Sequence, residues 1–165
     1  MTLKQRCLHN IITVTAAAVM LLITSTQPAW ADDHLSTGQE LYVPVYSHIY
    51  SGDKERPVYL AVTVSIRNTD PSQTIEVLAV DYYDSNGKLV QRYVEQPITL
   101  GPMASTRFVV KESDKAGGSG ANFIVLWQSP NPVNPPLTEG IMVTTASQLG
   151  ISFLTRGVPI VRHTP

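Results

Sequence analysis

Apolar and polar residues alternate with a period of two along most of the chain after residue 40. The clearest example is residues 58–68, VYLAVTVSIRN. The apolar face of this segment consists of Val58, Leu60, Val62, Val64 and Ile66. Because side chains alternate across a β-strand, this pattern predicts a half-buried strand of an antiparallel sheet.

Similar short segments follow, separated by residues that favour turns. They are residues 74–84, 89–94, 105–112, 121–128, 141–146 and 150–155. Residues 74–84 and 121–128 are apolar on both faces, which indicates central strands. Asn86-Gly87 predicts a hairpin with positive φ at both central residues, and Asn68, Asp70 and Pro71 favour another reversal. About eight strands without a helical period predict a single antiparallel β-sandwich, immunoglobulin-like in style, over residues 32–165.

Residues 41–50, LYVPVYSHIY, have two different faces when read as one strand. Aliphatic residues and Ser47 form one face, and the other carries a candidate contact surface of Tyr42, Tyr46, His48 and Tyr50. Aromatic rings with polar tips suit contact with a sugar, an aromatic ligand or a partner protein. The alternative is that these are half-buried tyrosines of no special role, because Pro44 confines the segment to an edge or a bulge. We expect an edge strand whose aliphatic face closes the core.

The first 31 residues have the features of a secretory signal peptide. Lys4 and Arg6 precede an apolar run over residues 11–23, and Ala29-Trp30-Ala31 has the small-x-small form of a cleavage site. The run is shorter than the roughly 20 residues that a spanning helix needs, although an uncleaved anchor is the alternative. We expect cleavage after Ala31 and a periplasmic or secreted protein with no further membrane attachment.

The remaining composition excludes several function classes. Cys7 is the single cysteine, so the mature chain has no disulfide and no thiol nucleophile. Without Lys4 and Arg6, ten basic and thirteen acidic residues leave a formal charge of −3. No basic run is present, and nucleic-acid binding is therefore not expected.

Three further motifs have both a functional and an ordinary interpretation. The glycine-rich residues 116–123, AGGSGANF, precede a strand and not a helix, so a flexible strand connection is expected and a phosphate loop or serine-hydrolase elbow is not. Asp81, Asp84 and Asn86 are either the oxygen ligands of a partial calcium loop or residues of an ordinary hairpin. The proline-rich residues 129–140 are a docking peptide, or a crossover between sheets that covers an edge.

Several segments together resemble one protein family. These segments are YVPVYSHIY, SIRNTDP, VDYYDSNGKLV, STRFVVKESDKAGGSGANF and QLGISF. They resemble the uncharacterised bacterial exported domain of unknown function 3124 family from about Tyr42 to Arg156. The resemblance implies a secreted or lipid-anchored single domain with no assigned activity, substrate, cofactor or catalytic residue. A lipid-anchored form would need a cysteine at the cleavage site, and its absence favours a soluble periplasmic form.

The function expected from the sequence is a non-enzymatic binding or interaction module of the cell envelope. Its partner is an envelope protein, and the alternative is a small ligand or a glycan at the same tyrosine face. A metal-assisted enzyme that uses Asp81, Asp84 or His48 is a further alternative, which requires ligands supplied by folding. No catalytic group of residues, cofactor site or metal site is predicted.

Overall fold

The computed structural model describes residues 35–144 and 150–161, so the predicted signal peptide lies outside the described residues. In this part of the chain all regular elements are strands, and no helix is long and apolar enough to cross a membrane. The twelve strands are β1 (Ser36–Pro44), β2 (His48–Ser51), β3 (Arg56–Tyr59), β4 (Ala61–Arg67), β5 (Ile75–Tyr83), β6 (Leu89–Arg92), β7 (Ile98–Leu100), β8 (Ser105–Val110), β9 (Asn122–Val133), β10 (Leu137–Thr144), β11 (Ile151–Arg156) and β12 (Val158–Pro159).

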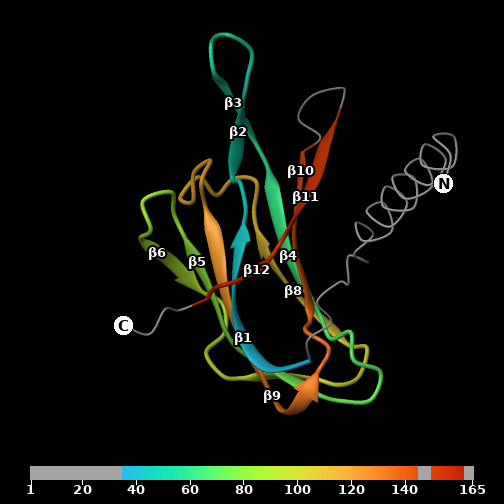
Figure 1. The fold of residues 1–165 in the computed structure, drawn as a ribbon. Helices are drawn as coiled ribbons and strands as arrows, with labels where there is room; N and C mark the ends of the chain where they lie inside the picture. The colour runs from blue at the N-terminus through green and yellow to red at the C-terminus, as the bar shows by residue number, and fades with distance from the viewer. Residues whose placement is uncertain (1–34, 145–149, 162–165) are drawn as a thin grey trace, which may run out of the picture. The chain divides into compact units, whose positions relative to one another are not determined.

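The strands form two large sheets and one separate hairpin (Figure 1). The six-stranded sheet has the order β12-β1-β9-β5-β6, with β7 also paired to β5. The four-stranded sheet has the order β11-β10-β4-β8, and β2 pairs with β3 alone. Every pairing is antiparallel, which confirms the prediction of an antiparallel all-β protein.

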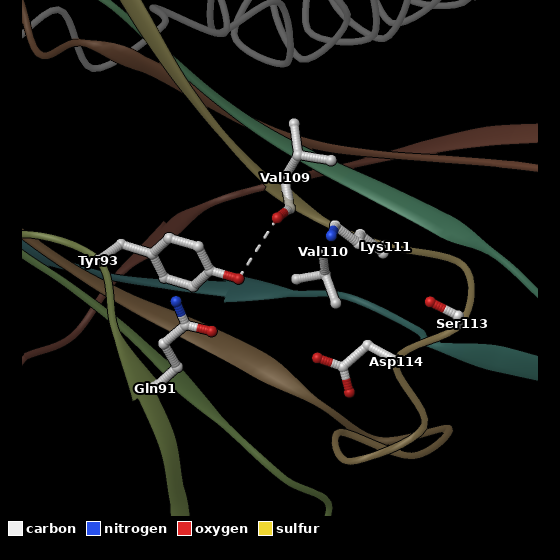
Figure 2. Close-up of a pocket in the computed structure, with 7 residues that line it drawn as sticks. All are labelled: Gln91, Tyr93, Val109, Val110, Lys111, Ser113 and Asp114. Atoms are coloured by element: carbon white, nitrogen blue, oxygen red, sulfur yellow. Dashed lines mark hydrogen bonds between the residues drawn. The ribbon is translucent and has the colours of Figure 1, made fainter.

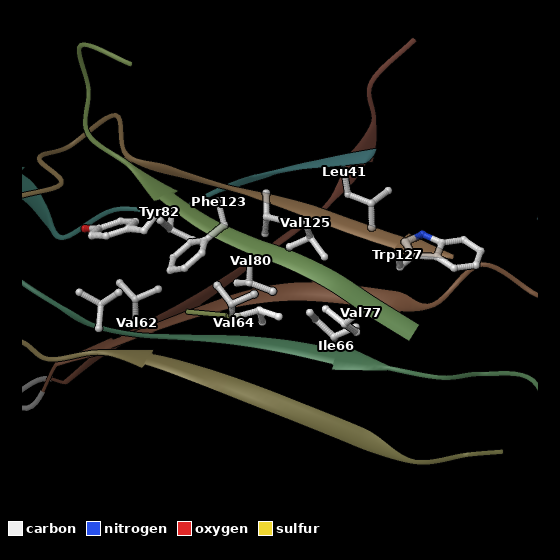
Figure 3. Close-up of a cluster of buried hydrophobic side chains, with 14 of the residues drawn as sticks. Leu41, Val62, Val64, Ile66, Val77, Val80, Tyr82, Phe123, Val125 and Trp127 are labelled. Atoms are coloured by element: carbon white, nitrogen blue, oxygen red, sulfur yellow. The ribbon is translucent and has the colours of Figure 1, made fainter. Parts of the chain in front are cut away.

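The core lies between the two large sheets (Figure 3). The alternating apolar residues Val62, Val64 and Ile66 of β4 are completely buried, as the period of two predicted. The largest buried side chains of the six-stranded sheet are Trp127, Tyr82 and Phe123. The rings of Tyr82 and Phe123 stack with their centroids 4.8 Å apart. Strand β9 pairs with both β1 and β5, and β5 pairs with β9 and β6, so the predicted central positions of these strands are confirmed.

The prediction of one edge strand over residues 41–50 is wrong. Strand β1 ends at Pro44 and lies between β9 and β12, so it is not at an edge. After Pro44 the backbone leaves β9, and the N–H of Val45 donates to the carbonyl oxygen of Ala121 at 2.9 Å. Strand β2 then starts a separate hairpin at His48. The alternation itself holds, since Leu41, Val43, Val45 and Ser47 are all buried.

The predicted strand count is also corrected. Residues 58–68 divide between β3 and β4 at Leu60, because the N–H of Leu60 donates to the carbonyl of Ser47 instead of to either large sheet. Two short strands, β7 and β12, were not predicted. Each of them has three residues or fewer, a length at which a period of two cannot be recognised.

The predicted Asn-Gly hairpin joins β5 to β6, but its turn differs from the expected type. Gly87 has φ of 76°, whereas Asn86 does not have a positive φ. The carboxylate of Asp84 accepts hydrogen bonds from the N–H groups of Asn86 and Lys88, at 2.8 and 2.9 Å. The loop is therefore longer than a two-residue turn and needs only one left-handed residue.

The proline-rich segment carries the chain between the two sheets. Pro130 and Pro132 belong to the exposed end of β9, and β10 begins at Leu137 in the other sheet, which confirms a crossover. Asp70 fastens this crossover, since its Oδ2 accepts the N–H of Asn134 at 3.2 Å. Its Oδ1 accepts from the backbone and hydroxyl of Ser72 and from the N–H of Gln73.

The two sides of the sandwich are closed in different ways. On one side, β11 of the four-stranded sheet continues through Gly157 into β12 of the six-stranded sheet. Gly157 lies close to β1 at this passage, and a Cβ there would make a tight contact of 3.2 Å with Val43 Cγ2. On the other side, the edge strands β6 and β8 belong to different sheets and leave an open seam.

Candidate functional site

The β2–β3 hairpin projects beyond the two large sheets (Figure 1). It carries an aromatic cluster at its base. The aromatic cluster consists of His48, Tyr50 and Tyr59. The His48 ring lies edge-on to Tyr50 and Tyr59, with centroids 5.1 and 5.9 Å away. His48 Nε2 is 3.2 Å from the Tyr50 hydroxyl, and Lys115 Nζ lies 4.5 Å above the Tyr59 ring. Tyr50 is 57% exposed, so the cluster has a face open to a partner.

The structure separates the four residues of the predicted contact surface. His48 and Tyr50 lie together in the aromatic cluster. Tyr46 instead packs edge-on against Phe153 of β11, with centroids 5.7 Å apart, and is half-buried. Tyr42 lies on the outer face of the six-stranded sheet, where it is paired with Val158 of β12. The end of β1 at Pro44 therefore divides what the sequence pattern joined.

Sequence reasoning missed Tyr59 and Lys115 as members of this site. Tyr59 faces the same way as His48 because the two residues are directly paired across the hairpin. The alternation in residues 58–68 already placed Tyr59 on the polar face, which was the available signal. Lys115 comes from the loop after β8, and no local pattern connects it with the hairpin.

Ser47 and His48 are adjacent, but they do not form a nucleophile and its base. The Ser47 hydroxyl is buried and donates to the carbonyl oxygen of Gly118 at 3.1 Å. Its oxygen is 3.5 Å from His48 Nδ1, which is longer than a good hydrogen bond between these atoms. An activated serine would need its proton directed at the histidine and an oxygen open to substrate. This pair has neither feature.

The glycine-rich loop is fastened to its neighbours, in contrast to the expected flexible connection. The carbonyl oxygen of Gly117 accepts from both the N–H and the hydroxyl of Ser85. The carbonyl of Gly118 accepts from the N–H and hydroxyl of Ser47. Gly118 has φ of 82°, and a Cβ at Gly117 would lie 1.8 Å from the Tyr82 hydroxyl oxygen. The glycines therefore allow close packing.

The acidic residues of the predicted hairpin have structural partners. Asp84 holds the turn, and Asp81 Oδ2 lies 3.9 Å from Arg92 Nε. Among residues 35–144 and 150–161, no group of three or more His, Cys, Asp or Glu side chains is arranged to hold a metal ion.

A polar pocket, the seam pocket, lies at the open seam between β6 and β8 (Figure 2). It has a volume of about 270 Å³. Its walls are Gln91, Tyr93, Val109, Val110, Lys111, Ser113 and Asp114. A shallower recess beside the aromatic cluster is lined by Tyr59, Glu112, Ser113 and Lys115. Ser113 borders both, so the loop after β8 separates two neighbouring concave surfaces.

Asp114 influences the tyrosines around this loop. Burial raises the pKa of Tyr82 to about 12, and the negative charge of Asp114 adds to this effect. Burial and then the Asp114 charge also raise the pKa of Tyr93 above its usual range. The Tyr93 hydroxyl donates to the carbonyl oxygen of Val109 at 3.4 Å.

Comparison with known proteins assigns this chain to a family. Residues 38–160 match the family described as "Protein of unknown function (DUF3124)". The chain belongs to the DUF3124 family. A comparison with curated proteins gives no match. A similar solved structure is described as the crystal structure of Thermotoga maritima 1070, with 12% identity, a TM-score of 0.44, and coverage of 73% of this chain and 92% of that one.

Proposed function

We propose that this DUF3124 protein is a non-enzymatic binding module of the bacterial cell envelope that contacts a partner protein through its aromatic cluster. The observation that supports this most directly is the projecting β2–β3 hairpin. Its base presents His48, Tyr50 and Tyr59 together, and Lys115 adds a positive charge beside them. Exposed tyrosines combine a large contact area with a polar tip, which is why they are enriched at interfaces.

The envelope location rests on the proposed signal peptide, residues 1–31. The proposed binding role fits the chemistry of the described residues. Asp84, Asp81 and Ser47, which could otherwise supply an acid or a nucleophile, are held by the turn, by Arg92 and by the carbonyl of Gly118.

A capture experiment with the full chain tests the proposal. The immobilised protein is used as bait in an envelope extract, and the retained proteins are compared with those retained by a Tyr50→Ala/Tyr59→Ala variant. Tyr42→Ala is the matched control, because Tyr42 is an exposed tyrosine on a different face. We expect a partner that is retained by the wild type and the control but lost by the double variant. Equal retention by all three would refute the assignment of the interface.

A small ligand or a glycan is the second candidate for this surface. The shallow recess favours it, since Tyr59 supplies an aromatic wall and Glu112, Ser113 and Lys115 supply polar groups. A thermal-shift screen of the same proteins distinguishes the candidates. A soluble compound at a hundred times its Kd would stabilise the wild type by about 2.7 kcal/mol, and the double variant would lose that shift.

We also propose that the fold is immunoglobulin-like in style. In support, β4 and β8 share one sheet, as strands B and E do in immunoglobulin domains. Strands β5, β6 and β9 share the other sheet, as strands C, C′ and F do. The difference lies at the ends of the chain. In an immunoglobulin domain the last strand, G, lies next to F, and the first strand, A, lies next to B. Here the first strand, β1, lies next to β9, and the late strand β10 lies next to β4.

A further inference from the structure

The seam pocket is built from both sheets and has a firm base. Tyr93 spans the gap, since its N–H donates to Val80 of the six-stranded sheet at 2.9 Å and its hydroxyl donates to Val109 of the four-stranded sheet. The Tyr93 ring also contacts Phe108 and Phe123, with both centroids 5.6 Å away. The base of the pocket is therefore formed by the two sheets, and the loop after β8 supplies Lys111, Ser113 and Asp114 at its rim.

The rim of the seam pocket is also held in place. The N–H of Asp114 donates to the carbonyl of Lys111 at 2.9 Å, and Asp114 Oδ1 accepts the N–H of Ala116 at 2.8 Å. The next residues, Gly117 and Gly118, are fastened to Ser85 and Ser47. Figure 2 shows the Asp114 carboxylate and the Gln91 amide facing each other across the pocket. A preformed polar site of this kind binds without the cost of ordering a loop.

The polar groups of the pocket indicate the class of ligand. Gln91 and Ser113 each offer a donor and an acceptor, while Asp114 accepts and Lys111 donates. The charges of Lys111 and Asp114 have opposite signs, so the lining residues have no net charge. The pocket therefore does not favour a charged ligand over a neutral one. A ligand with many hydroxyl groups is both donor and acceptor at each position, and it matches this mixture. The Tyr93 ring also lines the pocket and adds an apolar surface to these polar groups.

We propose that the seam pocket binds a neutral saccharide, independently of the protein contact that we assign to the aromatic cluster. Its volume of about 270 Å³ is slightly below the range of about 300–1,000 Å³ for drug-sized ligands, which suits one or two sugar rings. Asp114 is the single carboxylic acid among the lining residues, and glycosidases generally need a pair of carboxyl groups. The site therefore binds the saccharide and does not cleave it.

Titration of the full chain with N-acetylglucosamine and with its β-1,4-linked tetramer tests this proposal, with amide NMR signals as the readout. We expect saturable shifts at β6 and the loop after β8, and affinity about tenfold weaker in Gln91→Ala and Asp114→Asn. Asp114→Asn keeps an oxygen that can accept from Ala116, so the rim is retained. Asp53→Asn, at the exposed hairpin tip, is the matched control and should bind like the wild type.

Comparison of the two probes separates a free saccharide from a polymer as the source. Tighter binding of the tetramer would assign the site to a neutral glycan chain, and tighter binding of the monomer would assign it to a free sugar. The proposal is wrong if neither neutral probe saturates, if the seam variants bind like the wild type, or if glucosamine or galacturonic acid binds more tightly than the neutral sugars. Loss of binding in Tyr50→Ala/Tyr59→Ala alone would move the saccharide site to the aromatic cluster.

Discussion

Gly117→Ala should destabilise the protein strongly, although it adds one methyl group to a loop. The new Cβ would lie 1.8 Å from the Tyr82 hydroxyl oxygen, 2.6 Å from Tyr82 Cζ and 2.9 Å from the Cβ of Ala121. Carbon atoms in favourable contact are about 3.5–4.0 Å apart, so one of these groups must move. Tyr82 cannot move easily, because it is completely buried and stacked on Phe123.

The loop must therefore shift, and its hydrogen bonds to Ser85 and Ser47 weaken when it does. Overpacking a core costs about 1–3 kcal/mol, and each weakened hydrogen bond costs about 1 kcal/mol. We expect the free energy of unfolding to fall by about 2–4 kcal/mol. Adding Tyr82→Phe removes the nearest atom, so the double variant should recover part of this loss.

Urea denaturation, followed by the fluorescence of the buried Trp127, measures the effect. Gly101→Ala is the matched control, because a Cβ there would meet nothing within 4 Å and Gly101 does not have a positive φ. Its free energy of unfolding should stay within about 0.5 kcal/mol of the wild type. Equal midpoints for Gly117→Ala and Gly101→Ala would show that the loop does not pack on Tyr82 as described.

Two further predictions concern pH. Hydrogen bonds to the carboxylate, first from the N–H of Ser72, lower the pKa of Asp70, so its stabilising effect is present above the ordinary pKa of about 3.9 and is lost as pH falls below it. The urea midpoints of wild type and Asp70→Asn should therefore differ at pH 7 and converge as pH falls below the ordinary pKa of Asp, and a constant difference would contradict this. At alkaline pH the unfolded chain ionises Tyr82 from about pH 10, whereas the folded pKa is about 12, so stability falls between these values. Thermal unfolding at about pH 9 and pH 11 should show a smaller loss of Tm for Tyr82→Phe than for the wild type, and an equal loss would refute this role of Tyr82.

The sequence predicted the strands whose faces are buried in the core, because burial makes apolar residues recur at every second position or on both faces. The face of β4 with Val62, Val64 and Ile66 and the central positions of β5 and β9 followed from alternation and from apolar residues on both faces. Strand ends were less predictable. The alternation continues past the end of β1 at Pro44, because Val45 and Ser47 stay buried like Leu41 and Val43 although they lie outside the strand.

The candidate sites were only partly predictable for a related reason. His48 and Tyr50 were recognised because they are neighbours in one alternating segment. Tyr59 joins them through hairpin pairing, and Lys115 joins them through a loop. The seam pocket depends on which edge strands of the two sheets meet, and a period of two carries no information about the order of strands in a sheet.

The strand order also has a consequence for when the chain can fold. Strand β1 pairs with β9 and β12, so it waits for partners in the last third of the chain, whereas β4 pairs with β8 as well as with β10. Such distant pairing gives a high contact order, and proteins of this kind fold slowly. A nascent chain that stays unfolded until its last third is complete remains thin enough to pass through a translocation channel. The topology that delays folding would thus assist the export that we propose.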